Sequence, residues 1–186
     1  MSSPLSYHRL CELVEAGVIT NVKHEQINAA SIDVTLGNKI LVERTPPNRH
    51  NTFNLITLRN RSPLQMNEIV LQDGNIYTLQ PGQFILASTE QVFNLPNNIA
   101  AEYKMKSSMA RIGLNHSLAG WCDPGWNGSV LTLEMKNITQ YQPIGLQPGD
   151  AIGQMIFYEV DEVPADRSYA ARGRYNNDEA VSGIKK

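Results

Sequence analysis

Cysteine is scarce in this chain of 186 residues, which carries only Cys11 and Cys122. Two thiols cannot build a disulfide framework, and a reducing compartment would keep both of them free. Zinc-dependent nucleobase deaminases need a H-x-E segment and a P-C-x-x-C segment, because three ligands must hold the metal. The sequence has neither segment, and its four histidines are scattered without i, i+4 pairing. We therefore expect no metal held by the protein, and no zinc.

Long apolar runs are also missing. The longest, which begin at Val130 and Met155, fall far short of the ~20 residues that a membrane helix needs. The first residues lack the basic patch and apolar stretch of a secretory signal. The chain has 16 Lys and Arg against 18 Asp and Glu, so it has no basic surplus to neutralise a nucleic-acid backbone. These features predict a cytoplasmic protein with no membrane or nucleic-acid partner, whose anionic ligand would be small.

The residues that are present suit one compact domain over 1–186, since 41% of them are apolar. Ser6 is placed to cap a short helix that ends at Gly17. From residue 31 onward the chain alternates short β-branched or apolar runs with turn signals. The tetrapeptide Leu-Gln-x-Gly occurs three times, ending at Gly74, Gly82 and Gly149, and each copy has the composition of a tight turn. Short strands separated by frequent turns predict a mainly β, antiparallel fold of the jelly-roll or barrel type with short helices.

Two segments do not fit the strand pattern. Residues 44–67 are polar and rich in arginine, so we interpret them as an excursion from the fold, with solvated arginines as the simplest reading and a subunit contact as the alternative. Residues 167–186 have no apolar periodicity. We expect this C-terminal segment to be mobile unless a ligand or a partner orders it.

A short helix is expected over residues 107–113, capped by Ser107 and ended by Gly113. Lys106 and the adjacent hydroxyls of Ser107 and Ser108 could offer a positive charge and donors to a phosphate. Serine at a helix start is more often only a cap, so this pattern alone leaves both interpretations open.

Glu134 stands out in the run from Ser129 to Met135. Strand alternation places Val130, Thr132 and Glu134 on one face and the apolar residues between them on the other. A carboxylate enclosed on that face would need a cationic partner, for which Arg111 and Lys106 are the candidates. An outward-facing glutamate on a half-exposed strand is the alternative that the residues leave open.

Six segments follow one another at characteristic spacing: SIDVTLGN at 31–38, LQPG at 79–82, SSMARIGL at 107–114, DPGWNG at 123–128, LE at 133–134 and IGQ at 152–154. Together they resemble the dCTP deaminase branch of the trimeric dUTPase superfamily, from about Leu5 to Asn177. Agreement of several motifs in order is far more specific than any one of them.

The resemblance implies a distorted jelly-roll, dUTPase-like β-barrel protomer and a homotrimer with its sites at subunit interfaces. It implies a deoxynucleotide whose phosphates carry Mg²⁺, with no metal at the reacting base. Glu134 would be the general base, Arg111 would keep it ionised, and Ser107 would help to hold the attacking water. The implied substrate contacts come from Lys106, Ser108, Ala119, Asp123, Trp126, Gln154, Tyr169 and Arg174.

Two positions depart from the family's usual pattern. Lys106 stands where the family usually has arginine, which replaces a bidentate fork with a point charge. Residues 176–179 bring acids to a place where the family usually has Gln and Gly. The number of phosphates and any substituent at C5 of the base therefore stay open.

Gly120, Trp121 and Gln154 resemble the members that also hydrolyse dUTP to dUMP, and a small Gly120 is expected to leave room for a second water near Asp123. The sequence thus predicts a dCTP deaminase with a slower second hydrolysis. Three alternatives remain: a dUTPase that does not deaminate, a deaminase of dCMP or a 5-modified deoxynucleotide, and a catalytically silent nucleotide-binding regulator.

Overall fold

The computed structural model describes residues 3–45, 56, 59 and 63–185. The helices are α1 (Tyr7–Glu15), the 3-10 helix η1 (His24–Gln26), α2 (Ser107–Arg111) and α3 (Tyr169–Arg172). The strands are β1 (Ile19–Thr20), β2 (Ile32–Glu43), β3 (Met66–Val70), β4 (Tyr77–Leu79), β5 (Phe84–Asn94), β6 (Ile99–Met105), β7 (Leu114–His116), β8 (Trp121–Cys122), β9 (Asn127–Asn137), β10 (Ile144–Leu146) and β11 (Ala151–Glu159). The predicted mainly β class with short helices is confirmed.

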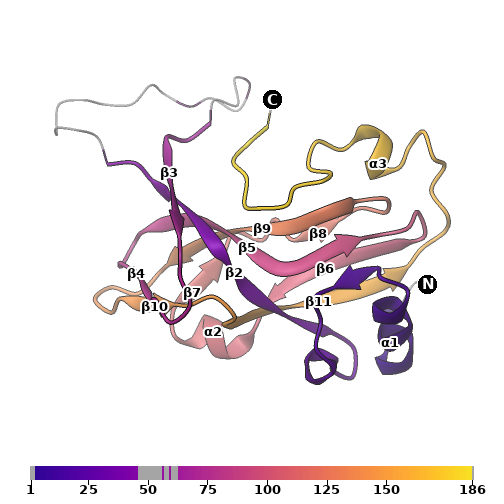
Figure 1. Cartoon of the computed structure of the whole chain (residues 1–186), viewed down its shortest axis with the longest axis horizontal. Helices are drawn as coiled ribbons and strands as arrows, with labels where there is room; N and C mark the ends of the chain where they lie inside the picture. The colour runs from indigo at the N-terminus through magenta and orange to yellow at the C-terminus, as the bar shows by residue number, and fades with distance from the viewer. Residues whose placement is uncertain (1–2, 46–55, 57–58, 60–62, 186) are drawn as a thin grey trace.

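Within the described residues the strands form a nine-stranded antiparallel sheet and a two-stranded one (Figure 1). The large sheet runs in the order β7-β9-β5-β2-β11-β6-β8, with β1 added to β5 and β3 added to β2, while β10 pairs with β4. The long strands change partners along their length: β2 pairs with β11 at one end and with β3 and β5 at the other. Such changes of partner, together with register shifts in β2 and β5, curl the sheet.

The three Leu-Gln-x-Gly segments are turns, as predicted. In each one the residue after the glycine donates its backbone N–H to the carbonyl of the glutamine, at 3.0 Å, 3.0 Å and 3.2 Å. Gly74, Gly82 and Gly149 all have a positive φ, between 78° and 85°. A bond across four residues with a left-handed third residue defines a type II turn, which favours glycine at that place.

The core lies on the concave side of the curled sheet and is closed by α1. Leu133 and Met135 of β9 are fully buried there, together with Phe157 of β11 and Leu10 of α1. Burying a side chain of this size contributes about 1.5–3 kcal/mol. Because every second residue of β9 points into this core, the residues between them must line the opposite face.

The helix ends differ in detail from the sequence prediction. Ser6 does precede α1, but its side chain makes no capping bond. Ser107 is the first helical residue of α2 and not its cap, because the extended residue before it is Lys106. The predicted stops are confirmed: Gly17 and Gly113 both adopt a positive φ two residues after the last residue of a helix.

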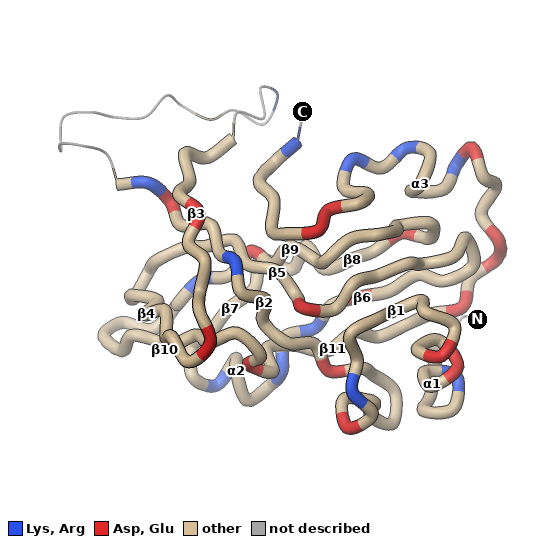
Figure 2. The backbone as a smooth tube through the Cα atoms, viewed as in Figure 1, with Lys and Arg blue, Asp and Glu red and all other residues tan. Residues whose placement is uncertain are grey.

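The two atypical segments both contact the large sheet. The end of the 44–67 excursion belongs to β3, whose Met66 pairs with Glu43, while Arg49 and Arg61 lie outside the described residues. The C-terminal segment crosses β9, where Val130 donates its N–H to the carbonyl of Asp178 at 2.9 Å. This contact places the segment against β9, and its expected mobility stays a prediction. Acidic and basic residues are interspersed along the described chain (Figure 2).

Candidate active site

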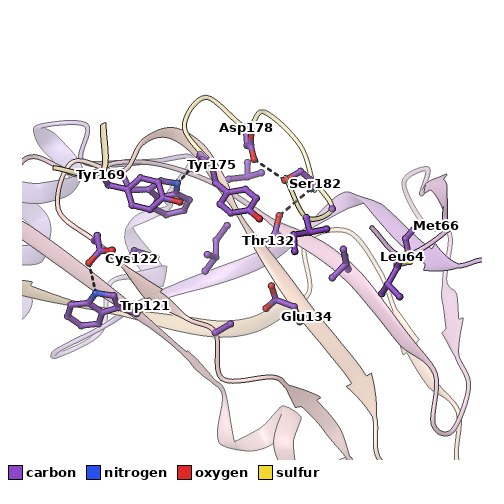
Figure 3. A pocket seen from close by; sticks show the side chains of 18 of the residues that line it. Leu64, Met66, Trp121, Cys122, Thr132, Glu134, Tyr169, Tyr175, Asp178 and Ser182 are labelled. Atoms are coloured by element: carbon purple, nitrogen blue, oxygen red, sulfur yellow. Dashed lines mark hydrogen bonds between the residues drawn. The ribbon is translucent and has the colours of Figure 1, made fainter. Parts of the chain in front are cut away.

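The face of β9 that points away from the core forms a wall of a cavity of about 630 Å³. Val130, Thr132 and Glu134 lie along this wall, as the alternation predicted. The cavity is roofed by the C-terminal segment and closed at one end by the chain around β3 (Figure 3). Its lining comprises Ile56, Leu64, Met66, Phe84, Leu86, Ala119, Trp121, Cys122, Asp123, Trp126, Val130, Leu131, Thr132, Glu134, Tyr169, Tyr175, Asp178, Ser182, Gly183 and Ile184.

Glu134 stands near the middle of the cavity in largely apolar surroundings (Figure 3). Its neighbour across the sheet is Leu86 of β5. The side chain is 30% exposed, so one part of the carboxyl group faces the cavity while its Oε2 is buried. A carboxylate with an open side toward a cavity and apolar walls around it is suited to exchange protons with a bound water.

Glu134 has a close polar neighbour that the sequence did not indicate. His116 places its Nε2 3.3 Å from Oε2 of Glu134. The geometry of this contact is not that of a hydrogen bond. Both atoms are buried and have no other hydrogen-bond partner among the described residues. Only the pairing of β7 with β9 brings the two together, because His116 lies opposite Met135.

Arg111 and Lys106, the expected partners of Glu134, do not contact it within one chain. Arg111 bonds to the hydroxyl of Ser107 at 3.4 Å, one turn away on α2. Lys106 forms an ion pair with Asp33 of β2. The described part of one chain does not make the expected contact with Glu134, and a contact across a subunit interface stays a prediction. Neither cation lines the cavity, and α2 lies on the far side of the sheet from the C-terminal segment (Figure 1).

Asp123 and Trp126 mark the other end of the cavity. Oδ1 of Asp123 accepts a bond from the indole N–H of Trp121 at 2.8 Å. Trp126 is 5% exposed and stacks on Phe93, with ring centroids 5.3 Å apart, so it presents only a small surface to the cavity. Its indole N–H donates to the carbonyl of Tyr175 at 2.7 Å, which ties the C-terminal segment to this end.

Burial and charge make the thiol of Cys122 unreactive at this end of the cavity. Burial, together with the nearby charge of Asp123, raises the pKa of Cys122 far above its ordinary value. A raised pKa keeps the thiol protonated near neutral pH, and a protonated thiol is a poor nucleophile. The described residues contain no group of three His, Cys, Asp or Glu side chains that could hold a metal ion.

The C-terminal segment is fastened to β9 by polar contacts. Asp178 forms an ion pair with Lys185 and accepts a bond from the hydroxyl of Ser182 at 2.9 Å. The backbone N–H of Ser182 reaches the hydroxyl of Thr132 at 3.3 Å, on the same wall as Glu134 (Figure 3). Tyr169 lines the cavity, whereas Arg174 is exposed and does not.

A second group of polar residues lies where β2, β6 and β11 meet the start of α2. Gln154 pairs with Asp33 in the sheet and accepts a bond from the hydroxyl of Ser31 at 3.0 Å. The ion pair between Asp33 and Lys106 is part of the same group. We call Ser31, Asp33, Lys106 and Gln154 the polar cluster. Lys106 and Gln154 of this cluster, with the adjacent Ser107 and Ser108, are four of the residues expected to contact the phosphates or the base, and none of the four lines the cavity.

Gly120 does not have the role expected of it. A Cβ at this position would stand 2.8 Å from the carbonyl oxygen and 3.2 Å from the backbone nitrogen of Tyr103. The glycine therefore lets β8 approach β6, and the space it leaves faces Tyr103 and not Asp123. The sequence could not have revealed this, because the neighbour across the sheet is 17 positions away.

The arrangement agrees with comparisons to known proteins. A family model described as dCTP deaminase-like matches residues 5–160. A protein named "dCTP deaminase, dUMP-forming" from Dictyoglomus thermophilum is 34% identical over 157 residues, which cover 82% of this chain and 77% of that protein. A protein of the same name from Persephonella marina is 31% identical over 183 residues, covering 97% of this chain and 96% of that protein.

The fold comparison points the same way. The crystal structure of 2'-deoxycytidine 5'-triphosphate deaminase from Agrobacterium tumefaciens superposes on 85% of this chain with a TM-score of 0.65 and 21% sequence identity. The match covers 48% of that protein, so this chain spans about half its length. The fold is thus shared with a β-protein of known structure that is a deaminase. The chain belongs to the dCTP deaminase-like family, which confirms the resemblance of its motifs.

Proposed function

We propose that this protein converts dCTP and water to dUTP and ammonia, and then hydrolyses dUTP to dUMP and diphosphate. The observation that carries this proposal is the half-buried Glu134 on the wall of a cavity that also holds Asp123 and Trp126. Relatives over 30% identical across most of the chain carry the name of the same reaction sequence, which supports it further.

In the first reaction Glu134 takes a proton from a water that attacks C4 of the cytosine. The protonated glutamic acid passes this proton to N3. The regenerated carboxylate then takes the remaining proton from the new C4 hydroxyl and passes it to the amino group, so that C4 becomes a carbonyl as ammonia departs. Ser107 and the carbonyl of Ala119 are proposed to hold the water, with Arg111 keeping Glu134 ionised. Ala119 lines the cavity, which is consistent with this role.

The sugar is proposed to bind at the end of the cavity formed by Asp123 and Trp126. A carboxylate oxygen of Asp123 accepts a hydrogen bond from the deoxyribose hydroxyl. The exposed edge of Trp126 packs on the sugar ring, where a ribose 2′-hydroxyl would be crowded. Tyr169 closes this end from the C-terminal segment, and Arg174, which is exposed, approaches the phosphates from the same segment.

The remaining site residues reach the nucleotide from a neighbouring subunit of a homotrimer. Within one chain α2 and the polar cluster lie outside the cavity, so Ser107, Arg111 and Lys106 have to enter it from another copy. Lys106, Ser107, Ser108 and Gln154 then contact the phosphates or the base. A closed ring of three subunits supplies such a contact at every site.

Magnesium enters this scheme with the nucleotide as the counterion of its phosphates. We expect activity to need Mg²⁺ and to survive removal of zinc, because the base reaction uses a carboxylate and not a metal-bound water. Assays after dialysis against a zinc-selective chelator, with metal content measured in parallel, check this expectation. Stoichiometric zinc whose removal abolishes activity would contradict it.

The second hydrolysis rests on the names of the relatives and on Gln154, not on Gly120. A second water must attack the α-phosphorus in line with the leaving diphosphate. Lys106 gives only a point charge to the phosphates, so we expect this step to be slower than deamination.

The decisive experiment follows dCTP, dUTP, dUMP and ammonia together during incubation with dCTP and Mg²⁺. Ammonia released with transient dUTP and final dUMP is the expected result. Accumulation of dUTP without diphosphate would restrict the activity to deamination. Hydrolysis of added dUTP without any ammonia from dCTP would identify a dUTPase, and parallel incubations with dCMP and 5-methyl-dCTP test the substrate class.

A further inference from the structure

His116 is a buried, titratable side chain that the proposed reaction does not yet use. It ends β7 and is 5% exposed, and the pairing of β7 with β9 fixes its place beside Glu134. Its Nε2 and Oε2 of Glu134 lie 3.3 Å apart, and both atoms are buried without a hydrogen bond in the described chain. Two complementary buried atoms that lack partners and face each other need only a small rotation of the carboxylate to pair.

The imidazole is held on its other side by Tyr103. The centroids of the two rings are 4.7 Å apart, and the ring planes meet at an angle of 60°. The hydroxyl of Tyr103 donates to the carbonyl of Ile152 at 3.3 Å, and burial raises the pKa of Tyr103 well above its ordinary value, so this group stays neutral. The titratable groups that face His116 in the described contacts are therefore Glu134 from β9 and neutral Tyr103 from β6.

We propose that His116 is a positioning residue for Glu134: a proton on Nε2 is directed at Oε2, which holds the carboxylate with its other oxygen toward the cavity. The inference rests on the proposed function, in which that other oxygen takes the proton from water. His116 keeps its own proton throughout and transfers none. Its effect is to favour the ionised carboxylate and to fix its direction.

The test compares substitutions that keep or remove the donor at the position of Nε2. His116→Phe keeps a ring but removes the donor, and should lower kcat by roughly tenfold or more while KM changes less than about twofold. The acidic limb of the plot of kcat against pH should move to higher pH. The reason is that the ionised carboxylate of Glu134 loses the Nε2–H donor that stabilises it. His116→Gln places an amide N–H near the former Nε2 and should restore most of kcat.

Two controls separate positioning from packing. Tyr103→Phe keeps the ring beside His116 and should leave the acidic limb in place. His8→Phe makes the same chemical change at an exposed position on α1 and should leave all rates unchanged. If His116→Phe does not fold, His116→Asn serves instead: its amide is too short to reach Oε2, so it should resemble the loss of the donor.

Nuclear magnetic resonance of protein labelled with ¹⁵N at histidine tests the contact without activity. The proposal expects His116 to carry its proton on Nε2 and its Nε2 resonance to shift in Glu134→Gln. If the wild-type protein does not deaminate dCTP, the proposed function fails while this measurement still decides on the contact. A wild-type kcat and pH profile in His116→Phe would overturn the inference, as would a proton on Nδ1 that does not respond to Glu134→Gln.

Discussion

At the scale of single residues, the proposed chemistry depends on where strand alternation places Glu134. The same alternation that buries Leu133 and Met135 in the core turns Glu134 toward the cavity. A carboxyl group in this place keeps part of its surface in contact with water while Leu86 beside it is apolar. It can therefore accept a proton from bound water without being fully hydrated.

Replacing Glu134 by Gln should lower the rate of deamination by at least ~100-fold, because the amide cannot accept the proton of the attacking water. Nucleotide binding should largely survive, since the amide has the same shape. Initial rates of ammonia release and calorimetric titration with dCTP measure the two effects. Glu68→Gln, an exposed acid of β3, is the matched control and should behave as wild type. Normal turnover in Glu134→Gln would remove this residue from the mechanism.

Replacing Gly120 by Ala tests the close approach of β8 to β6. The added Cβ would stand 2.8 Å from the backbone oxygen of Tyr103, and backbone atoms cannot move aside easily. We expect a loss of about 1–3 kcal/mol in the free energy of unfolding, as for other overpacked sites. Urea unfolding measures it, with Gly183→Ala as control because a Cβ there meets nothing within 4 Å. Unchanged stability in Gly120→Ala would contradict the contact.

At the scale of elements, the C-terminal segment and β9 together make the cavity. The segment buries Val181 and is tied down by hydrogen bonds and by the ion pair of Asp178 with Lys185. Such an element opens at lower free energy than the sheet beneath it. The C-terminal segment covers part of the cavity, and the expected mobility of residues 167–186 remains a prediction.

Replacing Lys185 by Gln should loosen this segment without unfolding the sheet. The ion pair is partly exposed, with 37% of the Lys185 side chain accessible, so its loss should be modest. Amide hydrogen exchange at Ser182 and Lys185 itself should become roughly twofold to fivefold faster. Exchange in the centre of β9 should not change. Lys136→Gln, which changes an exposed lysine of β9, is the control. Equal exchange rates at residues 182 and 185 in the two variants would argue that the ion pair of Asp178 with Lys185 does not hold the segment.

At the scale of the whole molecule, the proposed site residues form two groups that one chain keeps apart. Glu134, Asp123 and Trp126 lie on the cavity, while Arg111 and the polar cluster lie elsewhere. A homotrimer of three times 20.7 kDa reconciles this separation with a single chemistry, because each site then takes one group from each of two subunits.

Mixing two inactive variants tests this sharing directly. Glu134→Gln and Arg111→Ala should each be inactive alone, and their coexpression should restore about one quarter of wild-type activity. In the proposed trimer one subunit supplies Glu134 to a site and a neighbour supplies Arg111. With equal amounts of the two variants, each of these residues is intact with a probability of about one half, so about one quarter of the sites have both. Sedimentation first checks that all species are trimers. Coexpression that restores nothing would place both residues in the same subunit or outside the site, and an active monomer would contradict sharing altogether.

Local patterns in the sequence determined the turns, the class of fold and the face of Glu134. The Leu-Gln-x-Gly turns need only four consecutive residues, and their glycines adopt the predicted left-handed conformation. The alternation along β9 needs only a period of two. Such features depend on neighbours in the chain, and for that reason they can be read without a structure.

Contacts between distant segments were decided only by the tertiary structure. The strand pairing of β7 with β9 brings His116 to Glu134, and no residue next to His116 in the chain indicates this. The same holds for the ion pair of Asp33 with Lys106, which are 73 positions apart in the chain. It also holds for the close approach of Gly120 to the backbone of Tyr103. Register across a sheet is a property of the whole packed core, because it depends on which faces the core buries, and a motif along one strand does not contain it.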